Sequence, residues 1–466
     1  MKAATALVVL VATLTAILGL GCGRPAPPKN VIVIVVDTLR RDATSLEESP
    51  HGWGKPMPNF DRLIETGRAY PNTWSTAPWT VPSHATIFTG LLTPQHHCDS
   101  PTLRLRDVGP TFAERFAEAG YETAAFFSNP WLSDKTTGLL RGFQIKTEVD
   151  VGGMAELQTG SGDQGGRETL RNVGAWLDAR DRNKPFLLFV NFLEAHIPYS
   201  PPLEQRLAVG APESGEITVD WDYAYQAGLA TPASVDWNAV ARLYAADARW
   251  ADVYLGELMS ELTQRGLVDG SLIVVTSDHG ENLGEHGLFE HVFSLHETVL
   301  QVPLVVLGEG FEQGRDARPV MLADLYPTLV EWAGLRSDGQ DRPGVSLLAP
   351  AEPDRPTYAE VTPPGGALLG LLKQLNPELD VAPLDAERRS VRVADLRLTT
   401  CTCGTVELND LRLDPGQSRN LAAERPEAVE VLSGLLDNLG PAAGEAGLPP
   451  MDDETRERLR SLGYIH

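Results

Sequence analysis

Three stretches of the chain are almost continuous runs of β-branched and other apolar residues that end in polar side chains. They are residues 30–42 (NVIVIVVDTLRRD), 185–196 (PFLLFVNFLEAH) and 271–282 (SLIVVTSDHGEN). Such runs predict strands that are buried on both faces, as in a parallel sheet. Ligands of open α/β sheets collect at the carboxyl ends of the strands. The pattern therefore directs attention to Asp37, His196, Asp278 and His279, which stand at such ends.

Between these runs, apolar residues recur at helical spacing. Residues 111–120 (TFAERFAEAG) and 244–266 (YAADARWADVYLGELMSELTQRG) each close on a glycine, a common helix stop. Strands that alternate with helices predict an α/β fold, with a mostly parallel central sheet covered on both faces. From about residue 349 the pattern changes to short segments in which apolar and polar residues alternate, as in strands. This pattern predicts a small C-terminal antiparallel subdomain over 349–466.

Two segments are harder to interpret. Residues 209–237 form an acidic insertion that contains Gly and Pro, and residues 363–380 include the apolar patch ALLGLLKQL. We expect the patch to pack against the main domain; admission of a lipid-like substrate is the alternative.

The N-terminus predicts export. Lys2 precedes the apolar run of residues 3–21, and Gly21 and Cys22 resemble a bacterial lipoprotein cleavage site. We therefore expect a signal peptide over 1–22, lipidation of Cys22 and a catalytic domain over 28–348. Plain secretion and an uncleaved anchor are the alternatives. The predicted location is the periplasmic or extracellular side of a bacterial membrane, with the membrane contacted through the lipid.

Charge and cysteine content exclude some functions. The net charge of −24, from 63 acidic and 39 basic residues, disfavours nucleic acid as a partner, because phosphate backbones are held by clustered Lys and Arg. Cys98, Cys401 and Cys403 remain after Cys22. The CTC spacing is too close for a comfortable disulfide and lacks the further ligands of a zinc site, so no chemistry is expected from the cysteines.

Thr80 lies in the segment STAPWTVPSHATIFTG, residues 75–90. Pro82 suits the first turn of a helix, which predicts that Thr80 lies just ahead of a helix N-terminus. Free N–H groups there stabilise negative charge, but a hydroxyl also needs a cation or a base to become a nucleophile. Asp37, Asp278 and His279 suggest a divalent cation, because carboxylates suit hard ions and an added imidazole suits zinc or manganese. The alternative is that Thr80 or Ser83 merely caps the helix.

Eight segments in order resemble the sulfatase family of the alkaline phosphatase superfamily and cover nearly all of the mature chain. They are NVIVIVVDTLRRD, APWTVPSHATIFTG, GYETAAFFSN, HIPYSPP, IVVTSDHGENLGEHG, VLQVPLVV, DLYPTLVEWAG and DETRERLRSLGYI. The resemblance implies the α/β sandwich of that superfamily with a C-terminal subdomain. It also implies metal-assisted transfer of a sulfuryl or phosphoryl group from an anionic ester substrate.

The resemblance also implies roles for particular residues. Asp37, Asp278 and His279 would hold the metal (Ca, Mn, Zn or Mg, as one ion or two), with Thr80 as the nucleophile in contact with it. His196 and His291 would grip the substrate anion or, as in phosphodiesterase-like relatives, bind a second ion. His84 stands in place of the signature arginine, and His286 is expected at the surface or beside the ligands.

Departures from the family pattern shift the expected substrate. Sulfatases carry Cys or Ser at position 80, converted to formylglycine, and threonine cannot form that aldehyde. Thr38 replaces a second metal-binding Asp, and the Lys-x-His that contacts sulfate is replaced around FFSNPW. The changes favour a phosphate ester or diester over a sulfate ester. A headgroup phosphotransferase and a catalytically silent sulfatase-like binding protein are the alternatives.

Overall fold

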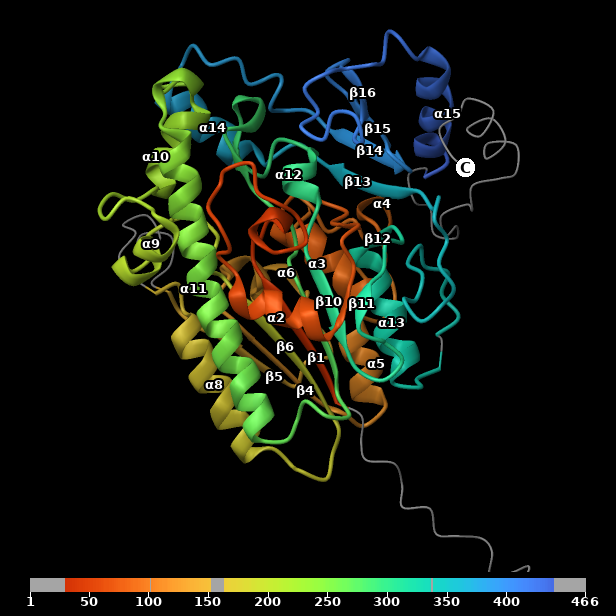
Figure 1. Ribbon diagram of the computed structural model, residues 1–466. Helices are drawn as coiled ribbons and strands as arrows, with labels where there is room; N and C mark the ends of the chain where they lie inside the picture. Colours follow the sequence, from red (N-terminus) through yellow and green to blue (C-terminus); the bar gives the residue numbers. More distant parts are fainter. Residues whose placement is uncertain (1–29, 101, 152–162, 337, 440–466) are drawn as a thin grey trace, which may run out of the picture.

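A large sheet runs through the centre of the protein (Figure 1). The computed structural model describes residues 30–100, 102–151, 163–336 and 338–439. The strand order in the eight-stranded sheet is β11-β2-β10-β7-β1-β6-β4-β5. The strands are β1 (Val31–Val36), β2 (Arg68–Ala69), β4 (Glu122–Phe127), β5 (Ile145–Glu148), β6 (Phe186–Phe192), β7 (Leu272–Thr276), β10 (Leu304–Leu307) and β11 (Gly314–Arg315).

The sheet is mostly parallel, as predicted. β1 pairs in parallel with both β6 and β7, and β4 pairs in parallel with β6 and β5, whereas β10 is antiparallel to β7 and β2. Val35 is in register with Asn191 of β6 and Thr276 of β7. The residues that follow β1, β4, β6 and β7 therefore emerge at one edge of the sheet, which is where the predicted site residues lie.

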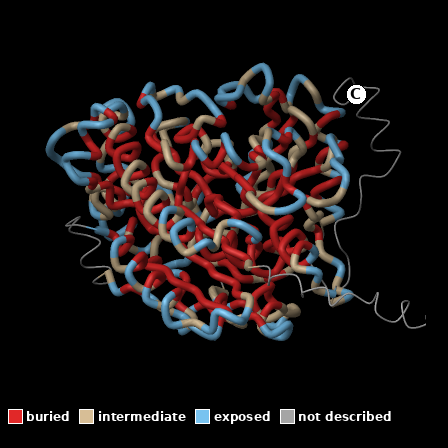
Figure 2. Tube along the Cα trace, turned by 60° about the horizontal axis from the view of Figure 1, so that its bottom comes forward, coloured by how far each residue is buried: buried red, intermediate tan, exposed pale blue. Residues whose placement is uncertain are grey.

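Helices cover both faces of the central sheet, so alternate residues of β1 point into two separate cores. Ile32, Ile34 and Val36 belong to one core cluster and Val31, Val33 and Val35 to the other. The helices of the first cluster are α2 (Pro58–Thr66), α8 (Gly166–Ala179) and α11 (Trp237–Gln264); those of the second are α3 (Thr80–Thr89), α5 (Phe112–Glu118) and α13 (Leu325–Trp332). Figure 2 shows the buried sheet beneath a partly exposed outer layer. Both predicted helices are present, and α11 begins at Trp237, earlier than expected.

A four-stranded antiparallel sheet forms the C-terminal part, as predicted. Its order is β13-β14-β15-β16, and α15 packs on it. These elements are β13 (Thr357–Val361), β14 (Arg388–Val393), β15 (Leu396–Cys401), β16 (Val406–Asp410) and α15 (Pro426–Asp437). The apolar patch forms α14 (Gly366–Leu375), and Leu372 packs with Ala227 and Phe293 of the main domain.

Shorter elements connect these layers. They are η1 (Arg41–Ala43), β3 (Thr73–Trp74), α4 (Thr93–His96), η2 (Pro130–Leu132), α6 (Asp134–Thr137), α9 (Leu203–Val209), α10 (Val219–Gln226), η3 (Pro232–Ser234), β8 (Asn282–Leu283), η4 (Glu285–Gly287), β9 (Phe289–Glu290), α12 (Glu297–Leu300), β12 (Val320–Met321) and η5 (Leu322–Asp324). The acidic insertion thus contributes α10 and η3. No helix in the described ranges is long and apolar enough to cross a bilayer. The predicted signal peptide and Cys22 lie outside the described residues.

The expectation for the CTC pair is wrong. Cys401 and Cys403 form a disulfide, and their Cα atoms lie 5.0 Å apart, within the usual range for such bonds. Cys401 ends β15, and Gly404 with positive φ lets the chain turn back towards β16. Sequence spacing alone did not reveal that this turn brings the two side chains together. Cys98 is buried and free.

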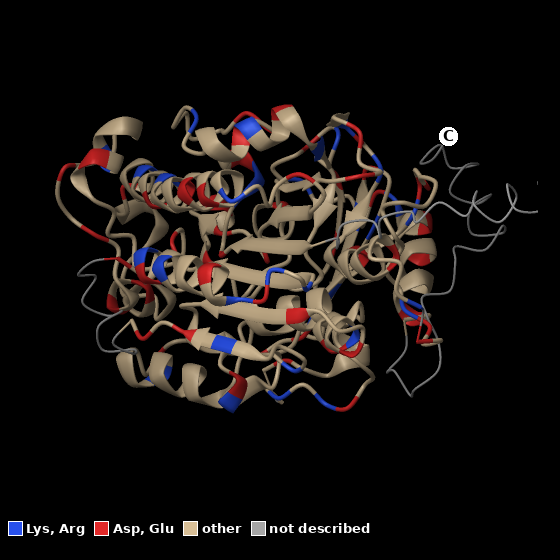
Figure 3. Ribbon diagram, turned by 90° about the horizontal axis from the view of Figure 1, so that it is seen from below, with Lys and Arg blue, Asp and Glu red and all other residues tan. Residues whose placement is uncertain are grey.

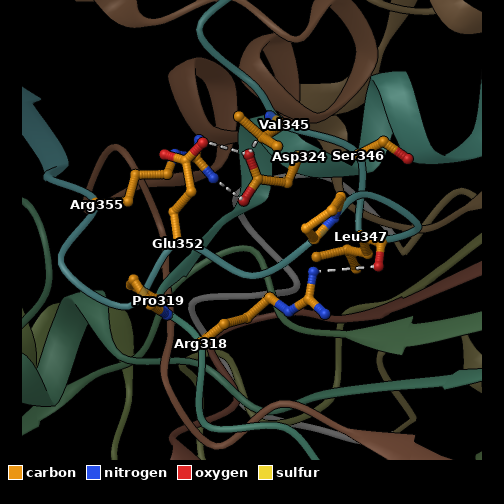
Figure 4. A pocket seen from close by; sticks show the side chains of 9 residues that line it. Arg318, Pro319, Asp324, Val345, Ser346, Leu347, Glu352 and Arg355 are labelled. Carbon is orange, nitrogen blue, oxygen red and sulfur yellow. Dashed lines mark hydrogen bonds and ion pairs between the residues drawn. The ribbon is translucent and has the colours of Figure 1, made fainter. Parts of the chain in front are cut away.

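Two further views show how charged residues are distributed and paired. In Figure 3, Lys and Arg are interspersed with Asp and Glu around the central strands. In the pocket of Figure 4, Arg355 donates to both oxygens of Asp324 at 2.8 and 2.7 Å, and Arg318 donates to the carbonyls of Leu347 and Ala349. These bonds fix the segment that leads to the C-terminal sheet. We therefore interpret the pocket as part of the packing of that segment.

Candidate active site

Two buried carboxylates from neighbouring strand ends each leave one oxygen unpaired. Asp37 follows β1, and its Oδ2 accepts from Asn129 Nδ2 at 2.7 Å and from Asn191 Nδ2 at 3.1 Å. Asp278 follows β7, and its Oδ1 accepts from the backbone N–H groups of Thr38 and His279 at 3.2 and 3.0 Å. Asp37 Oδ1 and Asp278 Oδ2 have no hydrogen-bond partner. Burial, together with the charge of Asp37, raises the pKa of Asp278 well above its usual value.

His279 completes the group with a free ring nitrogen. Its Nδ1 donates to the carbonyl of Gly280 at 3.0 Å, so the neutral ring keeps its lone pair on Nε2, which has no hydrogen-bond partner. Burial and the neighbouring His291 lower its pKa, which favours this neutral form. Ligand atoms of Asp37, Asp278 and His279, one from each, lie within 4.8 Å of one another. Two carboxylate oxygens and an unprotonated imidazole nitrogen fit a divalent cation.

Thr80 lies beside this group at the very start of α3, one position further into the helix than predicted. Trp79 is the N-cap residue and forms no side-chain cap bond. Asn129 Nδ2, which donates to Asp37, is also 3.3 Å from Thr80 Oγ1. Ser83 Oγ donates to the carbonyl of Asp278 at 2.7 Å. The capping alternative is therefore wrong for both hydroxyls, and Thr80 is linked to Asp37 through one amide.

His84 lies behind Thr80. Its Nδ1 donates to the carbonyl of Thr80 at 2.9 Å and is 3.4 Å from Asp278 Oδ2. The ring is fully buried against Phe88 and Phe189, and burial lowers its pKa. The lowered pKa favours a neutral ring at His84, unlike the arginine that the family resemblance implies at this position.

His196 and His291 line the other side of the group. The His291 ring centroid is 4.2 Å from that of His279 and 5.4 Å from that of His196. His291 Nδ1 is 3.1 Å from Glu281 Oε1, and its Nε2 is 3.3 Å from Glu290 Oε1. Burial opposes protonation of His291, but Glu290 and Glu281 outweigh it and raise its pKa to about 10. Both ring nitrogens of His291 therefore face carboxylate oxygens, which favours the protonated form.

Hydrogen bonds fix the loop that carries His196. Ala195 has a φ of 87°, a conformation that non-glycine residues rarely adopt, and its N–H donates to Asp247 Oδ2 at 3.2 Å. Gln164 Nε2 donates to the carbonyls of His196 and Pro198. His196 Nδ1 donates to the carbonyl of Ile197, which leaves its Nε2 free to face a ligand.

The structure brings together most residues singled out from the sequence, and it adds others. His286 is exposed and stacks on His296 with ring centroids 3.9 Å apart; no contact joins it to Asp37, Asp278 or His279 within the described residues. Asn129, Asn191, Glu281 and Glu290 were not predicted. A polar Asn191 within the apolar run PFLLFVNF was the available signal, because a buried amide needs partners.

Comparison with known proteins identifies the class. A family model described as Sulfatase matches residues 29–335. The choline-sulfatase of Rhizobium meliloti (strain 1021) is 25% identical over 445 residues, covering 84% of this chain and 82% of the relative. The chain belongs to the sulfatase family, a family of ester hydrolases.

Solved structures share the fold. The phosphonate monoester hydrolase of Agrobacterium radiobacter superposes with a TM-score of 0.69 at 20% identity, over 89% of this chain and 95% of that one. A protein solved with its substrate D-glucosamine-2-N,6-O-disulfate has a TM-score of 0.69 at 18% identity, over 93% and 98% of the two chains. Both agree with the α/β architecture that the sequence predicts.

Proposed function

We propose that this protein is a metal-dependent hydrolase of phosphate esters, with diesters favoured, and that Thr80 is its nucleophile. One observation carries the proposal: the Thr80 hydroxyl and Asp37 share the amide of Asn129 beside the unpaired atoms of Asp278 and His279. A divalent cation bound by Asp37, Asp278 and His279 would lower the pKa of the hydroxyl and offset charge on the substrate.

In the proposed reaction, Thr80 Oγ1 loses its proton and forms a bond to phosphorus. The bond from phosphorus to the leaving alcohol oxygen breaks, and that oxygen takes the electron pair and a proton. Water then attacks phosphorus, breaks the bond to Thr80 and restores the hydroxyl. His196 and His291, which lie beside His279, would contact the substrate anion.

The nucleophile decides between phosphate and sulfate. Threonine cannot form the formylglycine of sulfatases, whereas its hydroxyl can carry a phosphoryl group. The name of the choline-sulfatase relative keeps a sulfate ester as the second candidate.

The test compares 4-nitrophenyl phosphate, bis(4-nitrophenyl) phosphate and 4-nitrophenyl sulfate. We expect the diester to be turned over fastest, Thr80→Val to be inactive and Thr80→Ser to keep part of the activity. Mass spectrometry of acid-quenched protein should find the phosphoryl adduct on Thr80. Turnover of the sulfate alone would overturn the phosphate preference, and an active Thr80→Val variant would overturn the role of Thr80.

We further propose that the protein is exported and tethered through a lipid on Cys22. The support is the apolar run before Gly21 and Cys22. We expect the protein in the membrane fraction of a bacterial host and Cys22→Ser in the soluble or precursor fraction. Equal fractionation of the two would contradict the tether.

A further inference from the structure

Two tryptophans flank the groups proposed to react. Trp79 immediately precedes Thr80, and Trp131 follows Asn129 by two residues. Their rings meet edge to face, with centroids 6.1 Å apart and planes at 90°. Asn129 Nδ2 contacts both Asp37 and Thr80, so the two tryptophans belong to the backbone segments that supply site residues.

Trp131 is unusually open to solvent. Its exposure is 41%, and of the nine tryptophans it alone is among the exposed large apolar side chains of the described residues. Large apolar side chains left exposed beside a polar site commonly mark where a ligand binds. Its neighbour Leu132 is buried, so the turn that presents the indole is anchored in the core.

The two indole rings do not hold the reacting groups in place. The backbone N–H of Trp131 donates to Asn129 Oδ1 at 2.9 Å, a bond that a change of side chain preserves. Trp79 Nε1 donates to Asp99 Oδ1 at 3.0 Å, which fixes the orientation of that ring. Asp99 also accepts from the N–H groups of Ser100 and Thr362 at 2.7 and 3.3 Å, so its carboxylate is engaged and does not favour a cationic ligand.

In-line displacement distinguishes the leaving group of a diester from the substituent that stays on phosphorus. In such a displacement the leaving oxygen departs on the side opposite the attacking Thr80 Oγ1. The ester substituent that stays on phosphorus lies off this axis, on the flank of the reacting centre. Trp131 is the exposed aromatic residue on that flank, because its N–H is 2.9 Å from Asn129 Oδ1 and the amide of Asn129 contacts Thr80.

We infer that Trp79 and Trp131 form a subsite for the retained organic substituent of a phosphodiester, and that they select a flat apolar group such as an aryl ring. This inference rests on the proposed function, because the reaction at Thr80 defines which substituent is retained. Edge-to-face and stacked contacts with an indole favour such a group over a small alkyl group.

The test uses two diesters with the same leaving group, phenyl 4-nitrophenyl phosphate and methyl 4-nitrophenyl phosphate. We expect the wild type to prefer the phenyl ester in kcat/KM. Trp131→Ala should reduce the phenyl-to-methyl ratio about 10-fold, the size of one lost aromatic contact, and Trp131→Phe should keep most of it. Leu413→Ala, an exposed position at 66% on the C-terminal part, is the control and should leave the ratio unchanged.

Binding gives a second measurement that needs no turnover. Diphenyl phosphate should bind the wild type more tightly than dimethyl phosphate, and Trp131→Ala should remove the difference. Equal binding of the two by the wild type, or an unchanged ratio in Trp131→Ala, would overturn the inference. If Trp131→Ala lowered kcat/KM only for 4-nitrophenyl phosphorylcholine, that result would also overturn the inference. It would favour recognition of a cation by the tryptophans.

The two proposals fail in distinguishable ways. A Thr80→Val variant that stays active defeats the proposed function whatever the ratios show. A Thr80→Val variant without activity, together with an unchanged phenyl-to-methyl ratio in Trp131→Ala, defeats only the aromatic subsite.

Discussion

At the scale of single residues, the unpaired atoms of Asp37, Asp278 and His279 carry most of the functional argument. Each side chain uses one polar atom for a hydrogen bond and leaves another buried without a partner. Burying two carboxylates close together costs free energy, and a bound cation would offset that cost. The three residues therefore predict a cation before any reaction is considered.

Metal should stabilise the fold through these residues. Adding Mn²⁺, Zn²⁺ or Ca²⁺ to chelator-treated protein is expected to raise Tm, because at about 100 times Kd a ligand contributes ~2.7 kcal/mol. Calorimetry measures the rise without any substrate. Asp278→Asn should abolish it, whereas the exposed Asp181→Asn should not. A similar rise in both variants would place the cation elsewhere.

Asn129 should affect turnover more than its partner Asn191 does. Both amides donate to Asp37, but Asn129 also contacts Thr80. With saturating metal, Asn129→Ala should lower kcat on a phosphate ester about 100-fold, as for other lost donors that act on a reacting centre. Asn191→Ala should mainly weaken metal binding. Steady-state kinetics over a metal titration separates the two effects, and equal losses of kcat would contradict the difference.

At the scale of elements, two loops at the carboxyl edge of the sheet are joined by a partly buried ion pair. Arg40, after β1, donates to Glu285 Oε1 at 2.8 Å and pairs with Asp42. His51 reaches the same oxygen of Glu285 at 3.0 Å. Burial opposes ionisation of Glu285, but Arg40 outweighs it and holds the pKa of this carboxyl well below its usual value of 4.5. The pair connects the loops that follow Asp37 and Asp278.

Glu285→Gln should destabilise the protein by about 2 kcal/mol at pH 7, since a buried charged hydrogen bond is lost. A depressed carboxyl pKa contributes stability above the unfolded value and loses it as pH falls towards the folded value. The difference in unfolding free energy between wild type and Glu285→Gln, measured in urea, should therefore shrink below about pH 4.5. Glu47→Gln, at the surface pair with Arg41, should cost less than about 1 kcal/mol. A difference that stays constant with pH would contradict the assignment.

Strands and helices were predictable because their apolar periodicity is local, and so were the acids at strand ends. Asp37, Asp278 and His279 follow such runs directly. Asn129 was not predictable as a site residue, because its bonds to Thr80 and Asp37 span 49 and 92 positions of sequence. The Cys401–Cys403 bond depends likewise on how the chain turns between β15 and β16.

At the scale of the whole molecule, the C-terminal sheet is fixed to the catalytic part by a buried cluster. Glu297 at the start of α12 accepts from Arg397 Nε at 2.6 Å and from Trp74 Nε1 at 2.9 Å. Ala359 and Val361 of β13 pack beside Trp74. The cluster crosses from one sheet to the other, so the two parts should unfold together.

Arg397→Met should cost about 3 kcal/mol, because it leaves Glu297 buried with a weaker complement of donors. The double change Arg397→Met and Glu297→Gln should recover part of this loss, since the unpaired charge is removed. Urea unfolding gives the energies. Arg412→Ala, at an exposed pair with Asp395, is the control and should cost less than about 1 kcal/mol. A double variant no better than the single one would argue against the charge as the cause.

The direction of β1 also sets how the molecule would face a bilayer. The strand begins at Val31 and ends beside Asp37, so the described chain begins at one end of a six-residue strand and the site lies at the other, about 20 Å away. If the protein is tethered through Cys22 as proposed, the lipid would be attached on the N-terminal side of β1, the side opposite the site in this strand. We therefore expect it to process esters that diffuse in the surrounding aqueous compartment rather than headgroups of its own leaflet.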